Sequence, residues 1–302
     1  MQPAHRVLSY LIADGASYFD IAQDLSKINR RFYSQQYSYA VGSVDFVFAA
    51  DAGATTSVIA RISTAGDTWT VHNAWTKGQA HWLAQQRRAR RLIGPSAKPT
   101  WEDYKIYLDD AHRAAGNEVL VDLNNDAVGS GEWDYSVLHI EADDHSISEW
   151  YMHLIGGDVG STDRGLILGY QQSRATVQAE DPELPAEYGS NMYSALADDQ
   201  DGASPAVASD MEDENDEPPY DVDDYVGNDS NADWPMQQHV AAASVGSPQG
   251  VTPGFVAPCG LLRVDLAGVR PDGGDINAPT TMLNIHLVPG NYKGILAEPM
   301  GQ

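Results

Sequence analysis

The chain has 302 residues, of which 43 are acidic and 18 are basic, giving a formal net charge of −25. Such a surface repels phosphate groups over most of its area, which excludes nucleic-acid binding by the whole surface and leaves only a local basic site. No apolar run approaches the length of about 18 residues that indicates a transmembrane helix, so we expect no membrane partner. The single cysteine, Cys259, excludes an internal disulfide and favours folding inside a cell.

Short elements follow one another over the first 75 residues. An apolar stretch at 6–13 predicts a strand rather than a signal peptide, because polar residues interrupt it. The next segment, 17–31, predicts an amphipathic helix that Ser17 caps and that ends in the basic pair Arg30 and Arg31. Runs rich in β-branched and aromatic residues then predict three strands, at 37–50, 55–63 and 67–75.

A second helix of about 20 residues is predicted over 75–93, where Gly94 and a proline stop it. Its apolar side carries Trp75 and Trp82, which we interpret as core residues in preference to platforms for base stacking. The remaining faces carry four arginines that cannot belong to the core: Arg87, Arg88, Arg90 and Arg91.

This arginine cluster is consistent with three roles: a nuclear localisation signal, a solvated helix end, or a phosphate site. Cations in the last turn favour the helix dipole, but that effect needs one or two of them and the sequence has four. Phosphate contact by a few arginines is independent of base sequence and sensitive to salt. The sequence leaves these roles open.

Strand patterns continue on both sides of an acidic segment. Together with the first four strands they give ten to twelve, with two helices and no alternating βαβα rhythm. This pattern predicts an all-β fold, an antiparallel β-sandwich formed as a single jelly roll. The further strands are predicted at 104–110, 117–123, 132–142, 146–156, 164–178, 259–269, 281–290 and 292–299.

The acidic segment lies inside the chain. Residues 175–262 contain 18 of the 43 acidic residues and no Lys or Arg. Because strands on its two sides must pair, we expect 179–235 to be an acidic surface loop or projection of a discontinuous domain, 1–178 with 236–302, rather than a linker. Aromatic residues among the acids would hold it in part: Tyr188, Tyr193, Tyr220, Tyr225 and Trp234.

Few motifs point to catalysis or to a cofactor. Asp122, Asn124 and Asp126 have the spacing of an EF-hand loop, but Ala127 and Trp133 stand where that loop needs Gly and Glu. We therefore expect a polar turn there, with a bound divalent cation as the lesser alternative. The sequence has no nucleophile elbow and no phosphate-binding loop. A glycosidase would need a pair of carboxylates, but among 43 acidic residues no particular pair stands out. We expect neither an enzyme nor a cofactor.

Four segments carry a resemblance to a known family: DIAQDLSKINRRFYSQQYSYAVGSV (20–44), DTWTVHNAWTKGQAHWLAQQ (67–86), WEDYKIYLDD (101–110) and LNIHLVPGNYKGILAEPMGQ (283–302). They are similar to the capsid proteins of small circular single-stranded DNA viruses that encode a replication initiator. The resemblance covers about 110 residues at the front and 40 at the back, and the acidic middle is outside it. The terminal motif is its most specific part.

The resemblance implies a single jelly roll that self-assembles into an icosahedral shell around a genome. Its partners would be further copies of the chain, packaged nucleic acid and a host surface receptor. The protein would fold in the host cytoplasm or nucleus and end in the virion. The motif residues that carry over are structural: Asn29, Arg30, Arg31, Trp75, Lys77, Trp82, Pro289, Gly290, Tyr292 and Gly294.

One departure from the family bears on nucleic-acid contact. Many such capsid proteins begin with a long Arg-rich arm, whereas this sequence enters its first predicted strand almost at once. Folded basic patches would then face the genome while the acidic loop faces outward. The leading patch is Arg87, Arg88, Arg90 and Arg91, and the second is Arg30 and Arg31.

Two other classes of protein remain. A carbohydrate-binding or other cell-surface β-sandwich module would use the aromatic residues at 188–234 as its platform. A hydrolase on the same scaffold is the third hypothesis.

Overall fold

The computed structural model describes residues 4–48, 57–94, 101–122, 124–129, 131–141, 147–173, 225–229, 239–244, 246–270 and 275–301. It divides into two units, Met1–Tyr170 with Val226–Gln302, and Gln171–Tyr225. The predicted acidic loop at 179–235 lies outside the described residues except for 225–229. All the strands described belong to the first unit.

The larger sheet of the first unit has seven strands, and every pairing in it is antiparallel. Five of the strands lie in the order β10-β3-β14-β1-β5, while β11 and β15 also pair with β3. Alternate residues of β14 are buried, which is the pattern expected of a sheet with one face on the core. The strands are β1 (Val7–Ile12), β3 (Tyr37–Phe48), β5 (Leu120–Val121), β10 (Gln249–Thr252), β11 (Phe255–Ala257), β14 (Thr281–Leu287) and β15 (Ala297–Pro299).

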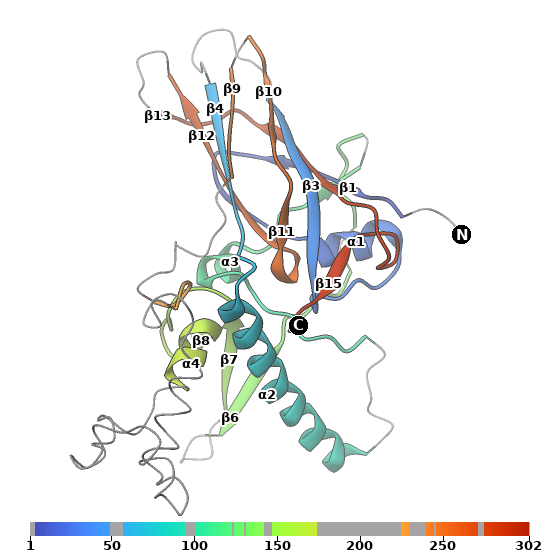
Figure 1. The fold of residues 1–302 in the computed structure, drawn as a ribbon, viewed down its shortest axis with the longest axis vertical. Coiled ribbons are helices and arrows are strands. Elements are labelled where there is room, and N and C mark those ends of the chain that lie inside the picture. The colour runs from blue at the N-terminus through green and yellow to red at the C-terminus, as the bar shows by residue number, and fades with distance from the viewer. Residues whose placement is uncertain are drawn as a thin grey trace, which may run out of the picture. The chain divides into compact units, whose positions relative to one another are not determined.

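A second antiparallel sheet of five strands faces the first. Its order is β13-β12-β4-β9, and β2 also pairs with β12, along 261–266. One hydrophobic core draws buried side chains from both sheets, among them Phe46 and Ile285 from the first and Phe19 and Val264 from the second. The predicted antiparallel β-sandwich is therefore confirmed (Figure 1). The strands are β2 (Gly15–Asp20), β4 (Ser57–Ser63), β9 (His239–Ser244), β12 (Leu261–Val269) and β13 (Asp275–Ile276).

A smaller mixed layer is inserted in the chain between β4 and β9 (Figure 1). Its three strands, β6 (Val137–Glu141), β7 (Ile147–His153) and β8 (Asp163–Gly165), form a sheet in which β8 runs parallel to β7. Three helices belong to this layer: α2 (Trp69–Ile93), α3 (Asp110–Ala115) and α4 (Leu166–Gln172). Within the described part of the chain, no helix is both long enough and apolar enough to cross a membrane.

Two tryptophans fix α2 in this layer. Trp75 and Trp82 are buried, and their ring centroids lie 5.9 and 5.6 Å from that of Tyr104. The same helix closes the edge of β6, because the Gln85 amide donates to the carbonyl of His139 at 2.6 Å and accepts from its N–H at 3.1 Å. The prediction that both tryptophans are core residues is confirmed.

The first helix begins later than predicted. Residues 15–20 form β2, and Phe19 packs in the sandwich core. The helix is α1 (Ile21–Asn29), and Asp20 rather than Ser17 caps it by accepting from the N–H of Gln23 at 3.1 Å. Pairing with β12 along 15–20 satisfies backbone groups that a helix would otherwise have used.

Two predicted strands are helices. The segment predicted as a strand at 67–75 forms the start of α2, where Thr68 is the cap and Val71, Ala74 and Trp75 are buried at helical spacing. At 164–178, β8 ends at Gly165 and α4 follows. Short runs of apolar residues do not distinguish a strand from a buried helix, and tertiary packing decides between them.

Other predicted strands are shorter than expected. The run at 104–110 makes a single bridge, from Tyr107 to His153, before Asp109 caps α3. At 292–299 a turn with positive φ at Lys293 and Gly294 precedes β15. A 3-10 turn, η3 (Pro258–Gly260), comes just before β12. The described residues thus contain four α-helices where two were predicted.

Substitution of Gly78 by alanine should destabilise the protein. Alanine is favoured over glycine by about 1 kcal/mol inside a helix. At Gly78, however, a Cβ would lie 2.6 Å from Tyr104 Oη and 2.8 Å from Leu166 Cδ2, and Tyr104 is fully buried. Overpacking costs about 1 to 3 kcal/mol, so we expect the free energy of unfolding to fall by about 1 kcal/mol in urea titrations.

Gly169→Ala is the matched control, because a Cβ at this position in α4 meets nothing within 4 Å. It should leave stability unchanged or raise it slightly. If Gly78→Ala were as benign as Gly169→Ala, the close packing of α2 against Tyr104 would be wrong.

Candidate nucleic-acid interface

The four arginines of α2 have different environments. Arg87, Arg88 and Arg91 are exposed, as predicted. Arg90 is half-buried and forms an ion pair with Glu102, so it holds the segment that starts at Trp101 against the helix. Three of the four predicted site arginines are therefore on the surface, while the fourth has a structural contact.

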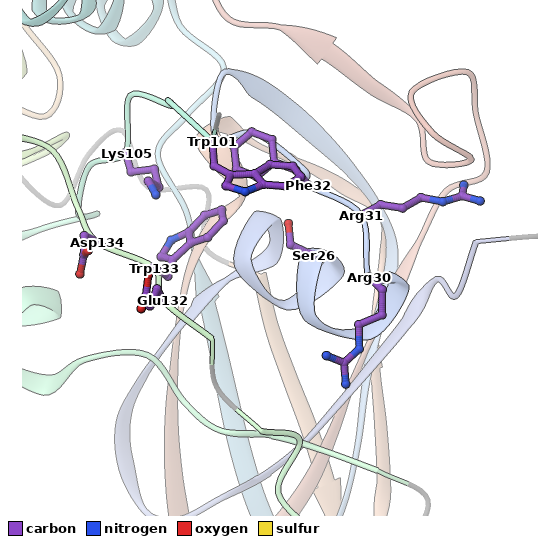
Figure 2. A pocket seen from close by; sticks show the side chains of 9 residues that line it. All are labelled: Ser26, Arg30, Arg31, Phe32, Trp101, Lys105, Glu132, Trp133 and Asp134. Atoms are coloured by element: carbon purple, nitrogen blue, oxygen red, sulfur yellow. The ribbon is translucent and has the colours of Figure 1, made fainter. Parts of the chain in front are cut away.

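The second predicted pair, Arg30 and Arg31, lies at the end of α1. Arg30 is the C-cap of α1, in a left-handed conformation with φ of 53°, and both Arg30 and Arg31 are exposed. They line an open pocket of about 720 Å³ (Figure 2). The other residues that line it are Ser26, Phe32, Trp101, Lys105, Glu132, Trp133 and Asp134.

Three aromatic rings form one wall of this pocket. The ring centroid of Phe32 is 5.8 Å from that of Trp101 and 6.1 Å from that of Trp133. Figure 2 shows the three rings gathered with Lys105, whereas Arg30 and Arg31 extend away from them. Trp101 is 66% exposed, which is unusual for a side chain of this size.

Cations gather around the aromatic wall. Lys105 Nζ lies 4.4 Å from the Trp133 ring centroid. Lys293 donates to the carbonyl of Phe32 and lies 5.8 Å from its ring centroid. Lys27 lines a smaller adjoining pocket of about 190 Å³. Three of the five lysines in the chain thus lie in or next to the pocket that Arg30 and Arg31 line.

Acidic groups offset part of this charge. Glu132 and Asp134 also line the pocket. Lys27 is paired with the buried Asp24 at 2.9 Å. Burial lowers the pKa of Lys105, and the nearby carboxylates of Asp103 and Asp20 oppose that shift. The site is therefore mixed in sign, with its cations on the side of α1 and the aromatic wall.

A buried carboxylate positions two walls of the pocket at once. Asp20 caps α1, whose end carries Arg30, and it accepts a hydrogen bond from the indole Nε1 of Trp133 at 2.9 Å. The side-chain amide of Gln35 donates to it at 2.7 Å and the hydroxyl of Tyr135 at 3.3 Å. Burial raises the pKa of Asp20 to about 6, although the hydrogen bonds to it act in the opposite direction.

A second buried carboxylate fixes the segment that carries Trp101 and Lys105. Asp103 accepts from the hydroxyl of Ser34 at 2.6 Å, from the backbone N–H of Gln35 at 3.0 Å and from the side-chain amide of Gln36 at 2.8 Å. The turn that follows Phe32 and the segment 101–105 are thereby joined into one support.

The C-terminal motif packs against the same turn. The ring of Tyr292 stacks on Tyr37 with centroids 3.9 Å apart, and its hydroxyl accepts from the N–H of Ser34 at 3.1 Å. Gly294 has a φ of +97°, a conformation that glycine adopts without strain. These residues have structural roles and place Lys293 beside Phe32.

Asp122 and residues 124–126 form a polar turn, as predicted. Asp122 Oδ1 accepts from the backbone N–H groups of Asn124 and Asp126 at 2.8 and 2.9 Å. Among the described residues, no group of three or more His, Cys, Asp or Glu side chains is arranged to hold a metal ion.

Comparisons of the chain with models of protein families, with curated proteins and with solved structures each found no match. The functional interpretation therefore depends on the residues and geometry of the site.

Sequence reasoning found the arginines of this interface but missed its aromatic wall. Trp101 lies in a segment of the family resemblance but carried no predicted role. Trp133 was predicted to lie in a strand at 132–142, yet β6 begins only at Val137 and the indole turns back to Asp20. A tryptophan next to two acids, in a segment with several glycines, is the local signal that could have marked it.

Asp20→Asn should remove part of the pH dependence of stability. The folded protein holds the Asp20 proton more tightly than the unfolded chain, so this stabilisation is full below pH 3.8 and is lost as the pH rises through about 6. With a pKa of about 6 in the folded protein and 3.8 in the unfolded chain, this stabilisation is about 1.4 kcal/mol at pH 5 and close to zero at pH 7.5.

Urea titrations at pH 5 and pH 7.5 measure this difference. The loss of stability over that range should be smaller by about 1.4 kcal/mol in Asp20→Asn than in the wild type. The exposed Asp110→Asn serves as the control and should keep the wild-type dependence. Equal pH dependence in all three proteins would contradict the assignment.

Proposed function

We propose that the chain is a viral capsid protein that self-assembles into an icosahedral shell enclosing a small single-stranded DNA genome. The order of eight strands is the observation that carries the proposal. β1, β14, β3 and β10 are neighbours in one sheet, and β2, β12, β4 and β9 are neighbours in the other. Along the chain these strands change sheet at every step except from β4 to β9.

This path supports the proposed jelly roll. A jelly roll consists of eight strands in two sheets, arranged as two Greek keys, and it occurs in viral capsids, lectins and cupins. The insertion between β4 and β9 lies outside this eight-strand order. Because one fold serves several functions, the choice among them depends on the site.

The site favours nucleic acid over the other ligands of this fold. In a chain with 18 basic residues, Arg30, Arg31, Lys27, Lys105 and Lys293 lie around one pocket. The ion pair of Arg90 with Glu102 links the arginines of α2 to the segment that begins at Trp101. We propose that this cationic surface faces the genome.

The family resemblance supports the same surface. Two of its four segments line the pocket: 20–44 supplies Arg30, Arg31 and Phe32, and 101–110 supplies Trp101 and Lys105. A third, 283–302, places Lys293 against Phe32. The carbohydrate-binding alternative depends on aromatic residues at 188–234. Of these, Tyr225 is the one described, and it is only 5% exposed, which does not suit a sugar platform.

Assembly should require salt. A net charge of −25 per subunit makes neighbouring subunits repel each other at low ionic strength, and salt screens this repulsion with a Debye length of about 10 Å at 0.1 M. We expect light scattering and electron microscopy of the recombinant protein to show closed, uniform shells at high salt or with divalent cations, and dissociation at a few millimolar salt.

Shells that were equally stable at a few millimolar salt would contradict the charge argument. Monomers at every salt concentration would contradict the proposed function and would favour the binding-module alternative.

Charge reversal at the end of α2 should weaken nucleic-acid binding without preventing assembly. Arg88→Glu with Arg91→Glu removes two exposed cations and leaves the ion pair of Arg90 intact. Each lost phosphate contact lowers the dependence of log K on log salt by about 0.7 for single strands, so the double variant should lose about 1.4. Fluorescence anisotropy of a labelled oligonucleotide gives this slope, and absorbance gives the nucleic-acid content of shells.

Arg61→Glu with Arg270→Glu is the control of equal charge. Both residues are exposed on or beside the second sheet, away from the residues of the pocket. If this control lowered the slope as much as the α2 variant, binding would follow net charge rather than the proposed surface.

A further inference from the structure

We propose that the pocket of Figure 2 binds an unpaired base of a single-stranded nucleic acid on the exposed face of Trp101, with the neighbouring phosphates against Arg30 and Arg31. The inference rests on the proposed function, because it names the part of the genome that the cationic surface would recognise. It adds base stacking to the phosphate contacts argued above.

Trp101 is the member of the aromatic wall that can take a base. Lys105 lies over the ring of Trp133, and the indole nitrogen of Trp133 is committed to Asp20. Phe32 is half-buried and packs against both tryptophans. Trp101 contacts Phe32 and still leaves two thirds of its surface exposed.

The backbone that bears Trp101 is anchored by contacts of the next two residues, although the Trp101 side chain is exposed. Glu102 pairs with Arg90, and Asp103 makes three hydrogen bonds to the turn at 34–36. A fixed aromatic platform loses little conformational entropy when it binds a ligand. This arrangement suits stacking better than a mobile loop would.

The size and charges of the pocket favour a single strand. Its volume of about 720 Å³ lies within the range of small-molecule sites, so it can hold a nucleotide but not a duplex. A duplex also hides the faces of its bases, and only an unpaired base can stack on a side chain. Glu132 and Asp134 repel phosphate from their end of the pocket, which directs the backbone toward Arg30 and Arg31.

The test compares a thymidine oligonucleotide with an abasic oligonucleotide of equal length, which has the same phosphates and no bases. Anisotropy is measured on subunits at low salt, where shells are dissociated. We expect the wild type to bind the thymidine strand about tenfold more tightly, and Trp101→Ala to abolish that preference while the salt dependence stays unchanged. Leu92→Ala, which removes another exposed apolar side chain, should keep the preference.

Arg30→Gln with Arg31→Gln should weaken both strands equally and lower the salt slope by about 1.4. Equal wild-type affinity for the two strands would overturn the inference. It would also be overturned if a sulfated oligosaccharide bound as tightly as the thymidine strand and lost as much affinity in Trp101→Ala. Electron microscopy of the same preparations at high salt reports on the proposed function separately, because shells would form there whether or not bases stack on Trp101.

Discussion

The buried carboxylate of Asp20 is the constraint on which the interface depends. It stands where β2 ends and α1 begins, so it caps the helix that leads to Arg30, and it also holds Gln35 and the indole of Trp133. Burying a charge is costly unless several donors compensate for it. Its pKa of about 6 indicates that burial raises the pKa by more than the hydrogen bonds lower it. The carboxylate is therefore costly to ionise, but its four hydrogen bonds keep these elements together.

The four arginines of α2 differ in their contacts. Arg90 pairs with Glu102 and so connects the helix to the segment of Trp101, whereas Arg87, Arg88 and Arg91 are exposed. A cluster selected only to end a helix would not need a partner on another segment. The ion pair thus ties α2 to the segment of Trp101, and Trp101 lines the same pocket as Arg30 and Arg31.

Sequence patterns were sufficient for the sandwich and insufficient for the pocket. The strand predicted at 281–290 is present as β14, with alternate residues buried, and helical spacing from Trp75 to Trp82 identified α2. The start of α2 was wrong because several of residues 69–75 are β-branched or aromatic, whereas Thr68 caps a helix there and Trp75 packs against Tyr104. Phe32, Trp101 and Trp133 are brought together by the two buried aspartates, and no local pattern encodes contacts between such distant residues.

If the chain assembles as proposed, charge alone would not retain nucleic acid at the salt concentration that a subunit of net charge −25 needs. Salt that screens repulsion between subunits also weakens phosphate contacts, and Glu132, Asp134 and Asp24 already offset part of the local positive charge. Stacking of a base on an aromatic ring does not release counterions, so it persists as the salt concentration rises. For the acidic shell protein proposed above, a site in which an exposed tryptophan supplements a few cations would therefore hold nucleic acid at high salt, and Trp101 with the cations around the same pocket is the candidate.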